Sequence, residues 1–314
     1  MRMKRLWFVD NLRIFLISLV VLHHLSITYG APGSWYYNES QPEGLLILPL
    51  AMFVATNQSF FMGLFFLVSA YFTEISLGRK SSSQFLLGRL LRLGIPLLLF
   101  FFVVSPFMGY FLIKNLRNPD ISFLSLFLEA EWFGIGPLWF VETLLLFTLI
   151  YFIWMQVSGK EPKHPSAMRP LPRDRWILLL AVITGLASFT VRIWLPVGWA
   201  IPVLNLQLPF FPQYLALLVL GIISARRNWL EQVTFRKGIR WFVFAQVMIF
   251  VGFPLLFLAG GAAGGNVDAF MGGPTWQSFA YSLWEQLTGF SLMIGLIGLF
   301  REKLNYQGKI ARQL

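Results

Sequence analysis

The chain has 314 residues, of which 57% are hydrophobic and only 12% are charged, and its mean hydropathy is +0.66. Soluble domains carry roughly a quarter charged residues, so this composition excludes an ordinary soluble globular protein. The sequence holds no cysteine and three histidines. It therefore excludes disulfides, thiol catalysis, iron–sulfur clusters and thiolate zinc sites, and it argues against a dedicated metal centre.

Apolar runs of about 20 residues recur along almost the whole chain, and each is long enough to cross a hydrocarbon core of about 30 Å as a helix. They predict an all-α polytopic transmembrane helix bundle with about eight spans, forming a single membrane domain over residues 1–314. The expected spans are 8–29, 58–75, 93–113, 137–157, 176–195, 209–225, 239–259 and 279–300.

Two segments between these spans need a separate interpretation. The apolar stretch from Leu45 to Val54 contains Pro49 and is too short to span by itself. It is either an interfacial or re-entrant piece or an extension of the second span. The segment 158–175 holds four prolines and alternating charges, which is typical of a linker, and we expect it to join two helical halves on the cytoplasmic side.

The net charge of +11 is explained by the distribution of Lys and Arg along the chain. Of the 25 cationic residues, 21 lie before the first span, in alternate loops, or after the eighth span. Lys and Arg accumulate in short cytoplasmic loops, so both termini are predicted to be cytoplasmic in a multi-pass protein of the cell membrane. Because membrane topology accounts for the positive charge, the charge does not indicate a nucleic-acid partner. The expected partners are membrane lipids.

The first span carries several ionisable residues, which are costly inside a membrane helix, at roughly 2.5 kcal/mol or more each at its centre. They indicate a retained helix rather than a cleaved signal peptide. Arg13 and His24 are eleven residues apart, which places them within about 20° of one helix face and about 16 Å apart along the axis. Asp10 lies three residues before Arg13, so a local ion pair can form, whereas His23 points about 100° away from His24.

Two interpretations remain open for these residues. In the functional one, Arg13 contacts an anion or a carbonyl near the cytoplasmic side, and the neutral imidazole of His24 acts deeper in the bilayer as a general base or nucleophile. In the structural one, Asp10 and Arg13 pair at the interface, and His23 and His24 form hydrogen bonds to neighbouring helices.

The sequence GRLLRLGIP, residues 88–96, opens the third expected span with Arg89 and Arg92 three residues apart. Two guanidinium groups on one helix face suit a phosphate or pyrophosphate, because Arg can bind oxyanions with two hydrogen bonds. The alternative is that they are ordinary cytoplasmic-side cations in contact with lipid headgroups, and the spacing by itself favours this alternative.

Two further stretches mix aromatic residues with a small or polar one: FFLVSAYF, which contains Ser69, and GPLWFVETLL, which contains Trp139 and Glu142. Small residues favour close helix packing, and clustered aromatic residues favour an interfacial belt. Glu142 falls within an expected span, as do Arg192 and Glu285, and any pair of opposite charge among them could form a buried salt bridge.

Taken together, five motifs resemble the acyltransferase 3 family of integral membrane acyltransferases, including its glucan succinyltransferase-like branch. They stand in the family's order over residues 5–231. The motifs are DNLR and HH, with ten residues between Arg13 and His24, then FFLVSAYF, the RxxR of Arg89 and Arg92, GPLWFVETLL, and LGIISARRNWLE.

The resemblance implies transfer of an acyl group, often acetyl or succinyl, from cytoplasmic acyl-CoA to a hydroxyl group of a carbohydrate or lipid-linked acceptor at or beyond the outer face. It implies His24 as the catalytic residue, Arg13 as its partner, and Arg89 and Arg92 near the phosphates of CoA. From the position of Asp10 beside Arg13, we expect these two residues to have an orienting role. Four residues are expected to support this site, without a metal: His23, Ser69, Trp139 and Glu142.

Two features depart from the family pattern. Ala70 stands where the family usually has glycine, which adds a methyl group at a packing position. The family usually has ten spans, whereas this sequence stops after the eighth, so we expect either a truncated sequence or a scaffold that lacks two helices. A non-enzymatic transporter or flippase of a glycan or lipid is the alternative function, and an inactive partner of another membrane protein is a third.

Overall fold

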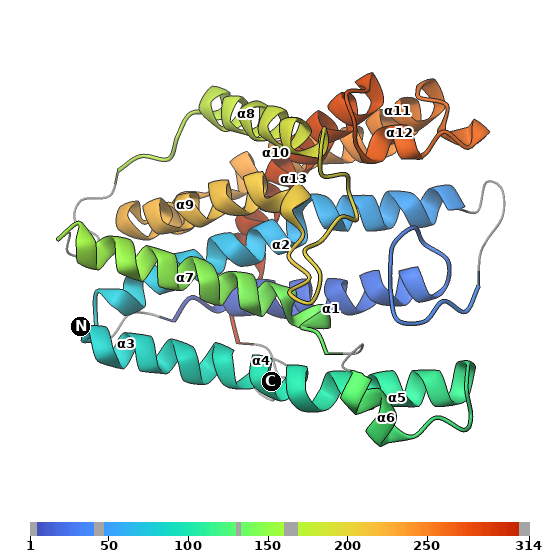
Figure 1. The fold of residues 1–314 in the computed structure, drawn as a ribbon. Coiled ribbons are helices and arrows are strands. Elements are labelled where there is room, and N and C mark those ends of the chain that lie inside the picture. Colours follow the sequence, from blue (N-terminus) through green and yellow to red (C-terminus); the bar gives the residue numbers. More distant parts are fainter. Residues whose placement is uncertain (1–4, 41–46, 130–132, 160–168, 308–314) are drawn as a thin grey trace. The chain divides into compact units, whose positions relative to one another are not determined.

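The computed structural model describes residues 5–40, 47–129, 133–159 and 169–307, and every named element within these ranges is helical (Figure 1). Eight helical stretches there are long and apolar enough to cross a membrane. The predicted all-helical class and the number of spans are thus confirmed, while the side on which the termini lie stays a prediction. The stretches are Trp7–Thr28, Ile47–Leu77, Ser82–Leu116, Gly136–Val157, Asp174–Arg192, Leu208–Arg227, Phe235–Ala259 and Trp276–Lys303.

The chain forms two compact units. The first comprises Met1–Tyr71, Pro165–Gly198 and Pro209–Leu314, and the second comprises Phe72–His164 and Trp199–Leu208. The α-helices of the first unit are α1 (Trp7–Thr28), α2 (Ile47–Leu77, which continues into the second unit), α8 (Asp174–Arg192), α9 (Phe211–Arg227), α10 (Phe235–Val247), α11 (Phe253–Ala259), α12 (Asp268–Met271) and α13 (Trp276–Lys303). Those of the second unit are α3 (Ser82–Arg89), α4 (Ile95–Leu99), α5 (Ser105–Leu116), α6 (Phe123–Glu129) and α7 (Trp139–Val157). Short 3₁₀ turns cover Gly136–Leu138, Leu208–Phe210, Leu230–Gln232 and Ala262–Gly264.

The surface of the spans is apolar where a soluble protein would be polar. Large apolar side chains are more than half exposed on several helices, which indicates surfaces that face lipid. Examples are Val21, Leu98, Phe111, Ile150 and Leu255.

Three π-helical turns interrupt the long spans, and each ends two residues before a proline. The turns are η2 (Leu90–Gly94), η3 (Phe100–Val104) and η7 (Met248–Gly252), followed by Pro96, Pro106 and Pro254. A proline lacks the N–H that would bond the carbonyl four residues earlier. In each case the residue before the proline donates instead to the carbonyl five residues earlier, as Ile95 does to Leu90. The wider turn keeps the backbone hydrogen-bonded where lipid offers no partner.

In the first unit, α13 packs against α1, α8 and α10, and glycines bring α2 close to its neighbours. A Cβ atom at Gly289 of α13 would lie 2.0 Å from the carbonyl oxygen of Ser59, and one at Gly221 of α9 would lie 2.3 Å from that of Leu67. Only glycine allows these helix pairs to approach so closely.

In the second unit, α7 packs against the π-helical turn η2. The rings of Phe85 and Phe152 stack with centroids 5.8 Å apart, and Gln156 donates to the hydroxyl of Ser82 at 2.9 Å. The side chain of Ser81 caps α3 by accepting from the backbone N–H of Gln84, so the third span begins well before the predicted residue 93.

The segment predicted over Leu45–Val54 is an extension of the second span from Ile47 on, because a continuous helix runs from Ile47 to Leu77. Its first two residues lie outside the described residues. Residues 160–168 of the predicted linker 158–175 lie outside the described residues. The end of that segment is held by the first unit, since Trp229 and Gln232 donate to the carbonyl oxygen of Arg169 at 3.2 and 3.0 Å.

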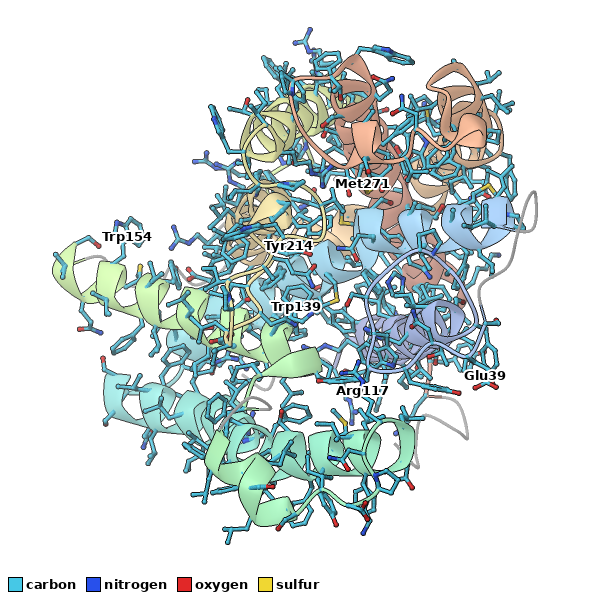
Figure 2. The ribbon with its side chains drawn as sticks, turned by 45° about the vertical axis from the view of Figure 1, so that its right-hand side comes forward. Glu39, Arg117, Trp139, Trp154, Tyr214 and Met271 are labelled. Atoms are coloured by element: carbon cyan, nitrogen blue, oxygen red, sulfur yellow. The ribbon has the colours of Figure 1, made fainter. Side chains whose placement is uncertain are left out.

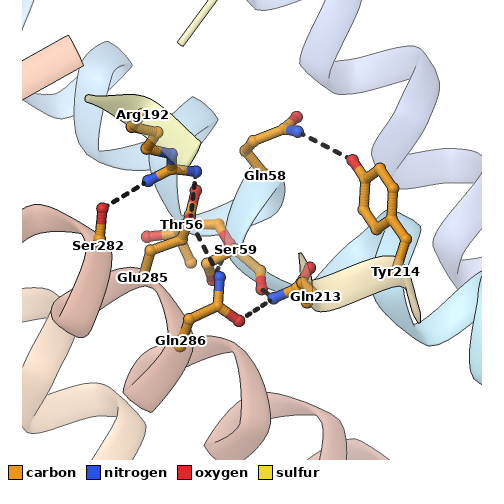
Figure 3. Close-up of polar contacts among 9 residues, drawn as sticks. All are labelled: Thr56, Gln58, Ser59, Arg192, Gln213, Tyr214, Ser282, Glu285 and Gln286. Carbon is orange, nitrogen blue, oxygen red and sulfur yellow. Dashed lines mark hydrogen bonds and ion pairs between the residues drawn. The ribbon is translucent and has the colours of Figure 1, made fainter. Parts of the chain in front are cut away.

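A network of polar side chains is buried between the helices of the first unit (Figure 3). Arg192 of α8 and Glu285 of α13 form an ion pair of 2.7 Å, and their side chains are 0% and 1% exposed. Arg192 also donates to the hydroxyl of Ser282 at 3.2 Å. Gln213 of α9 donates to Gln286 at 2.9 Å and to the carbonyl of Ser59 on α2 at 2.7 Å, so the network links four helices.

The Arg192→Met variant should lower the free energy of unfolding by about 3–5 kcal/mol, because it leaves the Glu285 carboxylate buried without its partner. The double variant Arg192→Met with Glu285→Leu should recover much of this loss, since it removes both charges. Unfolding of the detergent-solubilised protein, followed by circular dichroism, measures the effect. Wild-type stability of the single variant would contradict a structural role for the pair.

Candidate functional site

The N-terminal end of α1 carries the DNLR motif and is tied to the end of α13. Asn11 donates to the carbonyl oxygens of Leu304 and Tyr306 at 2.6 and 2.9 Å. Asp10 lies 3.8 Å from Arg13, which is the predicted local ion pair, but its closer partner is Arg5, whose Nε donates at 2.8 Å. The motif therefore has a structural part, Asn11, which the sequence interpretation missed because its partners are almost 300 residues away.

The orientation of His24 is defined by its own helix. Its Nδ1 atom lies 2.8 Å from the carbonyl oxygen of Val20, one turn earlier on α1. A carbonyl oxygen only accepts hydrogen bonds, so Nδ1 must carry the hydrogen. In the neutral ring this leaves the lone pair on Nε2, the atom that a general base would use.

His23 has a different environment. Its side chain is buried, its ring lies 5.1 Å from that of Phe61 on α2, and its Nδ1 has no hydrogen-bond partner among the described residues. The rings of His23 and His24 meet edge to face with centroids 5.5 Å apart. Of the two histidines, His24 is the one that has a defined tautomer and is only partly buried.

Trp35 covers His24. The indole lies in the loop that follows α1, and its ring centroid is 3.9 Å from that of the imidazole, at an angle of 37°. Sequence reasoning missed this contact, although the run SWYY in the same loop marks it as rich in aromatic residues.

Arg89 and Arg92 belong to the second unit and differ in their contacts. Arg89 donates to the hydroxyl of Thr73 at 2.9 Å, and its guanidinium lies 5.4 Å from the ring centroid of Phe85. Arg92 is exposed on the π-helical turn η2. The α-helical spacing assumed for this pair is therefore altered by the wider turn that precedes Pro96.

Thr73 is followed by a second polar residue that sequence reasoning did not single out. The carboxylate of Glu74 is buried and accepts a hydrogen bond from the hydroxyl of Tyr151 on α7. Thr73 and Glu74 thus join the end of α2 to α3 and α7 within the second unit. Both follow directly after the FFLVSAYF motif, which is the signal that could have identified them.

The remaining predicted residues divide between the two units. Ser69 lies half-buried on α2 in the first unit, next to Ala70, whose Cβ faces Gly221. The extra methyl group of Ala70 is thus accommodated by a glycine on α9. In the second unit Trp139 is buried at the start of α7, and Glu142 lies in the first helical turn, where a carboxylate is favoured by the helix dipole. The Oε2 atom of Glu142 is buried without a hydrogen-bond partner among the described residues.

Within the described ranges, no group of three or more His, Asp or Glu side chains could hold a metal ion. A cavity of about 220 Å³ lies in the first unit, where the start of α1 meets the end of α13. Its cations already have partners, since Arg5 pairs with Asp10 and Arg301 donates to the carbonyl of Val233 at 2.7 Å. The cavity is lined by Arg5, Leu6, Phe8, Glu231, Arg301 and Asn305.

Comparison with known proteins identifies relatives. The model of a family described as an acyltransferase domain matches residues 6–311. Proteins named glucans biosynthesis protein C, from Salmonella paratyphi A (strain ATCC 9150 / SARB42), Salmonella agona (strain SL483) and Salmonella choleraesuis (strain SC-B67), are 27% identical over 195 residues. The alignment covers 60% of this chain and 49% of each relative, so the match spans about half the length of these curated relatives. No solved structure matches the chain.

The hydrogen bond to Val20 makes a spectroscopic prediction for His24. In the protein labelled with ¹⁵N-histidine, at about pH 8, where an ordinary imidazole is neutral, the His24 signals should show a protonated Nδ1 and a bare Nε2. The His24→Asn variant identifies these signals by their loss. Signals of the opposite tautomer would show that the bond to Val20 is not formed.

Proposed function

Because this chain belongs to the acyltransferase 3 family and is therefore a membrane acyltransferase, we propose that it transfers an acetyl or succinyl group from cytoplasmic acyl-CoA to a hydroxyl group of a carbohydrate acceptor. Family membership favours the enzyme over the non-enzymatic transporter considered from the sequence. The eight apolar helices make it a multi-pass membrane protein, and we propose the cell membrane as its location, with both termini in the cytoplasm.

The observation that carries the proposal is the environment of His24. With Nδ1–H committed to Val20, Nε2 accepts the proton of the acceptor hydroxyl as that oxygen attacks the thioester carbonyl. A C–O bond forms, the C–S bond breaks, and the proton passes from the imidazolium to the departing CoA thiolate. The carbonyl of Val20 keeps its hydrogen bond throughout and stabilises the protonated ring.

Arg13 and Asp10 are proposed to support this chemistry from the same helix. Arg13 is partly exposed and paired with Asp10, which is itself paired with Arg5. A guanidinium held by a carboxylate loses less freedom when it binds a further anion or carbonyl.

Arg89 and Arg92 are proposed to hold the phosphates of CoA. Thr73 and the ring of Phe85 restrict the side chain of Arg89, while Arg92 is exposed to a ligand. Two guanidiniums near a helical turn suit a pyrophosphate because each provides several donors in a planar array.

The acceptor is proposed to be a carbohydrate, because the curated relatives are named for glucan biosynthesis. Four residues are proposed to support the site: His23, Ser69, Trp139 and Glu142. The loops rich in Trp and Tyr suit a sugar at the membrane boundary.

The His24→Ala variant should lose acyl transfer by about 10²-fold or more, the usual contribution of a general base, while remaining folded in the membrane. Ser18→Ala serves as the matched control and should retain most activity, because Ser18 is exposed on the same helix and donates only to the carbonyl of Ile14 one turn earlier. Transfer of a radioactive acyl group from acetyl-CoA or succinyl-CoA to membrane glycans measures both. Activity of His24→Ala equal to that of the wild type would refute the mechanism.

The Arg89→Ala and Arg92→Ala variants should each raise the KM for acyl-CoA by about tenfold or more, since a hydrogen bond to a charged group contributes about 1.5–3 kcal/mol. Arg117→Ala is the control, because Arg117 is an exposed arginine at the end of α5 in the same unit (Figure 2). Unchanged donor KM values would refute this donor site. Movement of acceptor across proteoliposomes without any acyl donor would instead indicate transport.

A further inference from the structure

The loop Tyr29–Ser40 is fastened to the end of α1. The backbone N–H of Glu39 donates to the carbonyl of Thr28 at 2.7 Å, and that of Ala31 donates to Ser26 at 2.8 Å. Gly33 adopts a φ of +152°, and a Cβ atom there would lie 2.7 Å from the side chain of Ile27. The loop therefore has a defined conformation that depends on glycine at this position.

Trp35 is held at the centre of this loop from two sides. One side is the imidazole of His24, with ring centroids 3.9 Å apart. The other is an apolar cluster of Ile27, Ala31 and Val54, with Leu50 and Phe53 of α2 packed against it. These two sets of contacts restrict the orientation of the indole over the proposed base.

Further aromatic rings and a carboxylate extend the surface beyond Trp35. The ring of Tyr36 meets that of Trp35 edge to face at 5.0 Å, and Tyr29 and Tyr37 are exposed. Tyr37 donates its hydroxyl hydrogen to the carboxylate of Glu39, which lies on the outer side of the loop (Figure 2). Burial raises the pKa of Tyr36, and the hydrogen bond to Glu39 raises that of Tyr37, so both phenols remain protonated at neutral pH.

This combination of groups matches the chemistry of a pyranose. The C–H groups of a sugar ring pack on aromatic faces, while its hydroxyl groups bond to carboxylate and phenol oxygens. A purely lipid-facing role fits less well, since an ionised carboxylate beside the rings is costly in hydrocarbon and Trp35 itself lies against His24.

We propose that the loop Tyr29–Ser40 is the acceptor subsite for a pyranose ring. The sugar binds to Tyr29, Tyr36, Tyr37 and Glu39. Trp35 is a positioning residue that places a hydroxyl group of the sugar beside His24. This inference rests on the proposed function, because it assigns the acceptor of that same reaction. Trp35 also shields the imidazole from water, which would otherwise compete with the sugar for the acyl group.

The test uses the full chain in lipid nanodiscs, a short linear oligosaccharide of glucose as acceptor, and acetyl-CoA or succinyl-CoA as donor. Trp35→Ala should raise the KM for the oligosaccharide by about tenfold, the change expected from loss of one aromatic contact, with a smaller change in kcat and no change in the KM for the donor. Trp35→Phe should restore the acceptor KM, because it keeps an aromatic ring. Trp194→Ala is the matched control, since Trp194 lies outside the loop and is 71% exposed.

Saturation-transfer NMR of oligosaccharide binding, in the absence of donor, separates this inference from the proposed function. Binding by the wild type that Trp35→Ala weakens supports the subsite even if no acyl transfer is detected. Absence of binding by the wild type, or equal binding and equal acceptor KM in Trp35→Ala, overturns it. A loss of nanodisc stability in Trp35→Ala with unchanged binding also overturns it, because the loop would then be a membrane-interface belt.

Discussion

The constraint on which the structure depends is that a backbone N–H or C=O group in hydrocarbon must find its partner within the protein. It explains why the spans are helical and why the helices widen into π turns where a proline removes a donor, as before Pro96 and Pro254. The same constraint explains why polar side chains of α1 bond to the backbone of their own helix. The hydroxyl groups of Ser18, Ser26 and Thr28 each donate to a carbonyl oxygen one turn earlier. His24 follows the same pattern.

That local pattern has a chemical consequence. An imidazole bonded to its own helix has its tautomer determined without help from a neighbouring helix, so the bare nitrogen is available for a reaction. Neighbouring elements then provide the environment: Trp35 lies on the ring of His24, and α2 packs behind Trp35. The hydrogen bond that satisfies the His24 ring inside the bilayer thus also sets the tautomer that the proposed general base needs.

The helices of the first unit are joined by polar contacts between distant parts of the chain. Arg192 and Glu285 join α8 to α13, Gln213 joins α9 to α13 and α2, and Asn11 joins α1 to the end of α13. Because single hydrogen bonds between membrane helices contribute little on average, a shared network and close glycine contacts are needed to hold the helices in one arrangement.

By itself the sequence determined the features that depend on neighbouring residues: the eight apolar spans, the ion pair between Asp10 and Arg13, and the face shared by Arg13 and His24. Helical periodicity sets these directly. Only the tertiary structure decided that Arg192 pairs with Glu285, that Trp35 covers His24, and that Thr73 accepts a hydrogen bond from Arg89. Periodicity gives the direction of a side chain within its own helix, but which helix or loop it meets depends on packing between segments far apart in the chain, such as the 93 residues that separate Arg192 from Glu285.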